Sequence, residues 1–221
     1  MYDLFHAAVR ALHNPFVVQV GACDGRTCDP VFPLIVERNL AGLLIEPLLD
    51  LLRECEANYC EAGVDMLWYV GCAVAALDGS ILLRRIDREH QDKLPAWTKG
   101  LGSAKDCNML NPKIREEHDV PDDVAALIEA HTVCQLVEAE PLQAILKARN
   151  IGRVDVLVID TEGMEYEVLQ TFDLDRYRPP VMLIEHTTMT SADRDLLQRH
   201  VSKAGYAWQD LGVDWLFTHQ D

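Results

Sequence analysis

The sequence predicts an α/β fold with a mostly parallel sheet, and the ends of two apolar runs carry this prediction. The first run, residues 16–20, is followed by the turn Gly21-Ala22-Cys23-Asp24-Gly25. The second run, residues 42–45, ends at Glu46, which lies 21 residues after Gly25. This spacing is typical of a Rossmann-like βαβ unit, in which the turn lets the backbone approach a nucleoside and the acid accepts hydrogen bonds from the ribose.

Apolar runs and amphipathic segments alternate along the chain, which predicts strands separated by helices. Parallel strands are expected over residues 16–20, 42–46, 66–70, 154–159 and 181–184. Helices on both faces of the sheet are expected between them, including residues 48–58, 141–149 and 164–171. Two more helices carry boundary signals: Asp29-Pro30 and Ser191 are typical N-terminal residues, and Gly205 is a typical terminator.

The C-terminal runs 206–208 and 215–218 are separated by a short connection, so they must pair antiparallel, since a parallel pair needs a crossover. The prediction is therefore a seven-stranded sheet with an antiparallel strand at its C-terminal end. Asp78-Gly79 predicts a hairpin between two apolar runs, and residues 132–137 predict an extra strand. Residues 87–122 are polar and weakly periodic, which predicts a lid-like, substrate-side insertion within a single domain of residues 1–221.

Composition narrows the class of protein. Of 221 residues, 49% are hydrophobic and 25% are charged, as in a globular chain, and the net charge of −16 repels nucleic acid. The cysteines are seven, an odd number without a Cys-x-x-Cys pair, which is typical neither of a zinc ribbon nor of a disulfide framework. We expect a reducing, cytoplasmic location. No charged and apolar leader and no membrane-length apolar run is found, so no membrane partner is expected.

Acidic residues follow four of the five parallel strands. Asp24 lies in the turn after the first strand, and Glu46, Asp160 and Glu185 end the second, fourth and fifth. Because ligands of open parallel sheets bind beyond the carboxyl ends of the strands, these acids should share one binding edge. The edge should attract a cationic ligand.

The turn after the first strand favours one nucleoside cofactor over the others. A dinucleotide turn has glycine at its second and third fixed positions, where this chain has Cys23 and Arg26, and the P-loop Gly-Lys-Ser/Thr is also missing. A cofactor without phosphate fits better. S-adenosylmethionine has a ribose for Glu46 and a cationic sulfonium and ammonium for the acidic edge.

These motifs also resemble a known family. The run 19–25 with Asp29-Pro30, then Leu44-Ile45-Glu46-Pro47, residues 158–165 (Val-Ile-Asp-Thr-Glu-Gly-Met-Glu) and Leu183-Ile184-Glu185-His186 are similar to the FkbM-type methyltransferases. The resemblance covers roughly residues 16–190 and implies a class I methyltransferase fold that uses S-adenosyl-L-methionine and releases S-adenosylhomocysteine. It further implies that the cofactor is lined by Gly21, Ala22, Asp24, Gly25, Glu46 and Pro47, with Cys72 and Ala73 near the adenine, and that Ser103 resembles a family serine more weakly. The family more commonly has Asn where this chain has Cys23.

The candidate catalytic residues are Asp160, Glu162 and His186, because a hydroxyl acceptor must lose its proton during methyl transfer. Glu185 is a further candidate base, and His131 a weaker one. Each has a structural alternative: Asp160 hydrogen-bonds the turn, Glu162 caps the next helix, or His186 is satisfied locally. Asp160, Glu162, Glu185 and His186 could also hold a divalent ion, but no metal is expected.

The preferred hypothesis is an S-adenosylmethionine-dependent methyltransferase that O-methylates a small hydroxylated acceptor, such as a sugar or natural product. The alternatives are a nucleotide-dependent oxidoreductase, which the missing glycines disfavour, and a non-catalytic binding module on the same fold. The acceptor, the methylated atom and the oligomeric state, including a homodimer, are left open.

Overall fold

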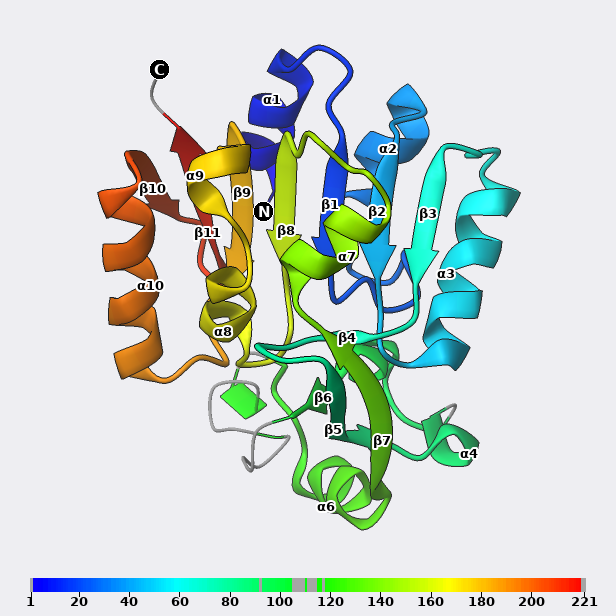
Figure 1. The fold of residues 1–221 in the computed structure, drawn as a ribbon. Helices are drawn as coiled ribbons and strands as arrows, with labels where there is room; N and C mark the ends of the chain where they lie inside the picture. The colour runs from blue at the N-terminus through cyan, green and yellow to red at the C-terminus, as the bar shows by residue number, and fades with distance from the viewer. Residues whose placement is uncertain (1, 92, 105–109, 111–114, 117, 220–221) are drawn as a thin grey trace.

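The computed structural model describes residues 2–91, 93–104, 110, 115–116 and 118–219. Its main sheet has seven strands in the order β10-β11-β9-β8-β1-β2-β3 (Figure 1). The bounds are β1 Val17–Val20, β2 Gly42–Ile45, β3 Leu67–Val70, β8 Val156–Ile159, β9 Val181–Glu185, β10 Tyr206–Asp210 and β11 Asp214–His219. Strands β1, β2, β3, β8 and β9 are parallel, and β11 runs antiparallel to both of its neighbours. The predicted mostly parallel sheet with an antiparallel C-terminal strand is confirmed.

Helices cover both faces of this sheet. One face packs against α1 Asp3–Ala11, α2 Phe32–Arg38 and α3 Leu49–Glu61. The other packs against α7 Leu142–Ala148, α8 Glu165–Gln170, α9 Leu174–Tyr177 and α10 Ser191–Lys203. Within β8, Val156 and Val158 belong to the first cluster, whereas Leu157 and Ile159 belong to the second. The central strands are apolar without interruption because both of their faces are buried.

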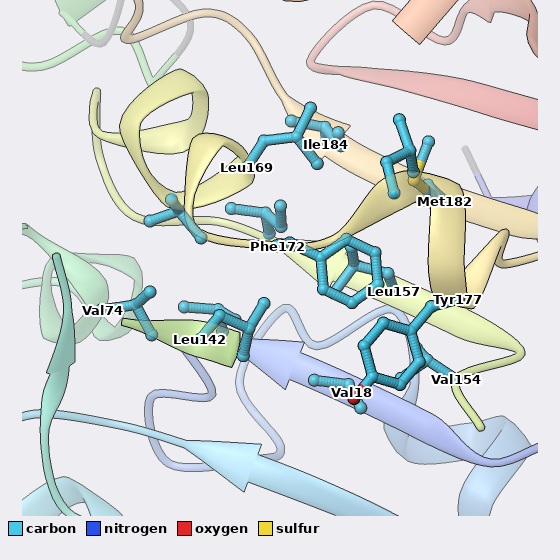
Figure 2. Packing of buried hydrophobic residues seen from close by; sticks show 14 of the residues in the cluster. Val18, Val74, Leu142, Val154, Leu157, Leu169, Phe172, Tyr177, Met182 and Ile184 are labelled. Atoms are coloured by element: carbon cyan, nitrogen blue, oxygen red, sulfur yellow. The ribbon is translucent and has the colours of Figure 1, made fainter. Parts of the chain in front are cut away.

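Figure 2 shows the second of these clusters, in which side chains from α8 and α9 meet the sheet. Leu169 and Phe172 lie over β8 and β9, close to Leu157, Met182 and Ile184. All five side chains are at most 5% exposed. This packing holds the C-terminal end of α8 against the sheet.

A second, four-stranded sheet lies beyond the carboxyl ends of the main strands (Figure 1). Its order is β4-β7-β5-β6, with bounds β4 Ala73–Val74, β5 Gly79–Ile86, β6 Gly102–Ser103 and β7 Thr132–Glu140. The neighbouring α4 Arg88–Gln91, the 3₁₀ helix η1 Ala96–Gly100 and α6 Asp122–Ala130 belong to the same region of the chain. The predicted extra strand is β7, which continues three residues further than expected.

The hairpin predicted at Asp78-Gly79 is wrong. The chain does turn there, but β4 and β5 do not pair with each other, because β7 lies between them. Ala139 of β7 pairs with Ala73 on one side and with Gly79 on the other. The local turn signal was correct, and the strand partner came from sixty residues further along the chain.

Two predicted helix starts and one predicted helix cap, Ser191, also differ from the structure. Asp29 does accept hydrogen bonds from the backbone N–H groups of Val31 and Phe32, but the helix begins only at Phe32. Helix α10 begins at Ser191, and its cap is Thr190, whose hydroxyl accepts from the N–H of Asp193. Helix α8 begins at Glu165, later than expected.

The stretch expected to be an insertion, residues 87–122, contains α4, η1 and β6. Residues 92, 105–109, 111–114 and 117 of that stretch lie outside the described residues. None of the described helices is both long and apolar enough to cross a membrane.

Candidate active site

The turn after β1 is built on two glycines in the left-handed region. Gly21 has φ of +84°, and a Cβ there would lie 1.7 Å from the carbonyl oxygen of Asp160. Gly25 has φ of +65°, and a Cβ there would lie 2.4 Å from Sγ of Cys55. The turn therefore packs directly against the end of β8 and against α3, which only glycine permits at these positions.

Glu46 ties this turn to the end of β2. Its Oε2 accepts a hydrogen bond of 2.9 Å from the N–H of Cys23, and its Oε1 accepts one of 2.9 Å from the N–H of Leu48. The side chain is only 5% exposed, and burial raises the pKa of its carboxyl to about 7, against the two backbone donors that lower it. Glu46 therefore supports the loop and also lines the adjoining pocket.

Asp24 has a structural role in the same turn. Its carboxylate accepts hydrogen bonds from the N–H groups of Arg26 and Thr27 and from the Thr27 hydroxyl. Burial opposes ionisation, but these donors prevail and lower the pKa of Asp24. Lys99, on η1, forms ion pairs with Asp24 at 3.3 Å and with Glu54 at 3.2 Å. These ion pairs connect η1 to the turn after β1 and to α3.

A pocket opens at the carboxyl edge of the main sheet, with about 740 Å³ of empty space including the solvent at its mouth. Seven residues predicted from the sequence line it: Gly21, Glu46, Pro47, Cys72, Ala73, Asp160 and Glu162. Cys23, the residue that departs from the family pattern, lines it as well. Glu46 and Asp160 thus meet the glycine turn in one pocket, whereas Asp24 and Glu185, which were expected at the same binding edge, do not line it.

Much of the pocket wall was not predicted from the sequence. It consists of apolar side chains from α3 and its approach, from β4 and β5, and from the start of α8: Leu48, Leu51, Val74, Ile81, Leu83 and Met164. Gly100 and Gly102 complete the side formed by η1 and β6. Ile81 and Leu83 belong to the apolar run that follows Gly79, but nothing local shows that these two side chains line a pocket at the main sheet.

Other predicted site residues lie outside the pocket lining. Ala22 and Gly25 are internal to the turn, and Asp24 caps it. Ser103 lies next to the lining residues, and its hydroxyl donates to the carbonyl oxygen of Glu162 at 3.3 Å. His186 is buried beyond the end of β9, where its ring stacks on Trp215 at 4.5 Å and its Nε2 lies 3.4 Å from Asp210.

The connection from β8 to α8 carries three acids with different environments. Glu165, the first residue of α8, ties the turn before the helix: its Oε1 accepts from the N–H and hydroxyl of Thr161 and from the N–H of Gly163, and the N-cap residue of α8 is Met164. Glu162 has φ of +55° and lies in the turn before the helix, so the expected capping by this residue is wrong.

Asp160 faces the pocket with an exposed side chain, yet protein surrounds it on its other sides. Desolvation, followed by repulsion from Glu185, Asp214 and Glu165, raises the pKa of Asp160 well above its usual value. The carboxyl therefore titrates at a higher pH than a free aspartate, which suits a group that receives a proton.

Comparison with known proteins identifies the family. The model of the methyltransferase FkbM domain matches residues 19–207. A structure of methyltransferase FkbM from Methylobacillus flagellatus KT is 15% identical, with a TM-score of 0.55 over 93% of this chain and 44% of the other. The METTL16 methyltransferase domain is 9% identical, with a TM-score of 0.52 over all of this chain and 67% of the other. No curated protein matches the chain.

The two structural likenesses are distant in sequence and establish the fold. This chain spans less than half the length of the Methylobacillus protein. The family model, by contrast, covers most of the chain, including the turn after β1, Glu46 and the β8–α8 connection. The chain therefore belongs to the methyltransferase FkbM domain family, and its cofactor is S-adenosylmethionine.

Proposed function

We propose that this chain transfers the methyl group of S-adenosylmethionine to a hydroxyl oxygen of a small acceptor, such as a sugar or natural product. The observation that carries the proposal is that the Gly21 turn, Glu46 and Asp160 line the same pocket. A bound nucleoside and a reacting group can meet there, because all three lie at the carboxyl edge of the sheet.

The cofactor would bind across this edge. Glu46 would accept hydrogen bonds from the ribose diol, and the apolar side chains Leu48, Leu51, Ile81 and Leu83 would enclose the adenine together with Cys72 and Ala73. The sulfonium would then lie on the side of Asp160, where the negative potential stabilises its charge. Gly21 has no side chain to obstruct this path.

The chemistry would be an in-line displacement. The acceptor oxygen attacks the methyl carbon, the carbon–sulfur bond breaks, and S-adenosylhomocysteine leaves. The hydroxyl proton passes to a base, for which Asp160 and Glu162 are the pocket-lining candidates. His186 would have to act from outside that lining, so its role in catalysis is the weakest of the three.

A small acceptor is favoured over nucleic acid by charge. The net charge of −16 opposes association with a phosphate backbone, which normally depends on basic side chains. We propose that residues 87–122, whose η1 and β6 glycines reach the pocket, select the acceptor. A cytoplasmic location is consistent with six free cysteines among the described residues.

Isothermal titration calorimetry with S-adenosylhomocysteine tests the cofactor site first. A saturable heat is expected, and its absence at high micromolar ligand would contradict the proposal. Titration with NADH is the matched control, since an oxidoreductase would bind NADH instead. Turnover is then measured with labelled S-adenosylmethionine on a panel of hydroxylated acceptors. Cofactor binding without labelling of any acceptor would indicate the non-catalytic module.

A further inference from the structure

Three acids from separate elements converge beside the proposed acceptor site. Asp160 directly follows β8, Glu165 begins α8 and Glu185 ends β9, and one carboxylate oxygen from each lies within 4.8 Å of the others. Glu165 is fully buried, Glu185 is 6% exposed, and Asp160 opens toward the pocket. The cluster thus has two buried members, Glu165 and Glu185, and one member, Asp160, that a ligand in the pocket can reach.

One oxygen of this cluster has no partner. Glu165 uses Oε1 for three donors, at 2.9 Å, 3.1 Å and 3.0 Å. Its Oε2 is fully buried and has no hydrogen-bond partner among the residues that the structure describes. A buried carboxylate oxygen without a donor is costly, so a native structure that keeps one normally supplies a proton, a water or an ion.

The surroundings add negative charge. Within the described part of the chain, neither Asp160 nor Glu165 forms an ion pair with a lysine, arginine or histidine. Asp214 and Asp29 also act on Asp160 through repulsion. Such a concentration of acids is stable when a bound cation balances it.

We propose that Asp160, Glu165 and Glu185 bind one divalent cation of the magnesium or manganese class, and that this cation holds the acceptor hydroxyl. This inference rests on the proposed function. The donor set is entirely carboxylate oxygen, which hard cations prefer and which does not favour zinc or copper. The hydroxyls of Thr187 and Thr188 donate to the two oxygens of Glu185 and orient it.

The open side of Asp160 gives the site its function. A cation held by the two buried glutamates and by Asp160 has further coordination positions on the side of the pocket. At one of them an acceptor oxygen can replace a water molecule. Coordination lowers the pKa of that hydroxyl and fixes its direction toward the methyl group. Glu162 and His186, which the sequence suggested as ligands, are replaced in this set by Glu165.

Binding of Mn²⁺ to the metal-free protein, followed by electron paramagnetic resonance, tests the site directly. The wild-type chain is expected to bind about one equivalent saturably below about 1 mM. Glu165→Gln and Asp160→Asn should each weaken this binding at least about tenfold. Glu138→Gln, at an exposed position on β7, is the matched control and should bind like the wild type.

Two results would overturn the proposal: no saturable Mn²⁺ binding to the wild-type chain, or unchanged binding in both cluster variants. Circular dichroism checks folding, and Asp160→Asn, at the exposed member, keeps the test valid if Glu165→Gln does not fold. Titration of the wild-type chain with S-adenosylhomocysteine separates the two hypotheses. If the wild type binds the cofactor but not Mn²⁺, only the cation site is rejected, whereas a wild type that does not bind the cofactor rejects the proposed function.

Discussion

Substitution of Glu46 by glutamine separates the support of the turn from the binding of the cofactor. The carboxylate accepts one backbone hydrogen bond on each oxygen, from Cys23 and Leu48. A glutamine amide has only one accepting atom, so one of these two N–H groups faces an NH₂ group instead. The substitution also removes the charge that we expect to bind the ribose diol.

The expected loss of affinity follows from these contacts. A hydrogen bond to a charged group contributes about 1.5–3 kcal/mol, so Glu46→Gln should raise the Kd of S-adenosylhomocysteine about 10- to 150-fold. Stability should change much less. Removal of a buried charge whose pKa is raised relieves desolvation, and this gain offsets the lost backbone hydrogen bond.

The pH dependence gives a second readout of the same residue. The pKa of Glu46 is raised from 4.5 to about 7, so its ionisation costs stability as the pH rises between those values, and the cost is constant above them. Cofactor affinity should follow the opposite course, because the ionised form binds the diol. Between pH 8 and pH 6 the affinity should fall about tenfold.

Calorimetry at both pH values, with urea unfolding in parallel, measures these effects. Glu56→Gln on the exposed side of α3 is the control and should match the wild type. The reasoning is refuted if Glu46→Gln binds S-adenosylhomocysteine as tightly as the wild type, or if its affinity keeps the wild-type pH dependence.

Further outcomes are expected at other positions. Gly21→Ala should lose more than about 3 kcal/mol of unfolding free energy, because its Cβ meets backbone at 1.7 Å, whereas Gly212→Ala, with open space around it, should lose only about 1–2 kcal/mol in urea unfolding. Lys99→Met should release S-adenosylhomocysteine about two- to fivefold faster in stopped-flow measurements, since it removes the ion pairs of η1; an unchanged rate would exclude this attachment. His186→Gln should lose about 1 kcal/mol of stability through its ring stacking while the Kd of S-adenosylhomocysteine stays constant; a weaker Kd would place this residue in the site.

The parallel strands were predictable because burial on both faces leaves a continuous apolar run. Each of the five expected parallel strands begins and ends within two residues of the observed one. Their order brings Glu46 and Asp160 to the edge where the Gly21 turn lies, so the core of the site followed from strand ends alone.

The failures arose where a partner lies far along the chain. Nothing near Asp78-Gly79 showed that β7 would separate the two strands. His186 follows a predicted strand, but the ring that it stacks on belongs to β11, which no local pattern could place beside it.

The sequence did not show which acid after β8 accepts hydrogen bonds from the preceding turn. Glu162 and Glu165 are both available, and the choice depends on the backbone. Glu162 and Gly163 both have positive φ, of 55° and 106°, which turns the chain so that Glu165 reaches the N–H of Thr161. The glycine in this motif was a signal for the turn, but not for its direction.

The position of β1 between β2 and β8 has a consequence for how the protein acquires its activity. Val17 pairs with Val156, a residue 139 positions later. The turn at Gly21 therefore lacks the strand against which it packs until most of the chain has been synthesised. Contacts of such sequence separation form slowly, and no partial fold can contain the pocket. Ligand binding should therefore stabilise the sheet as a whole, and a substitution deep in β8 or α7 should lower cofactor occupancy without touching the ligand.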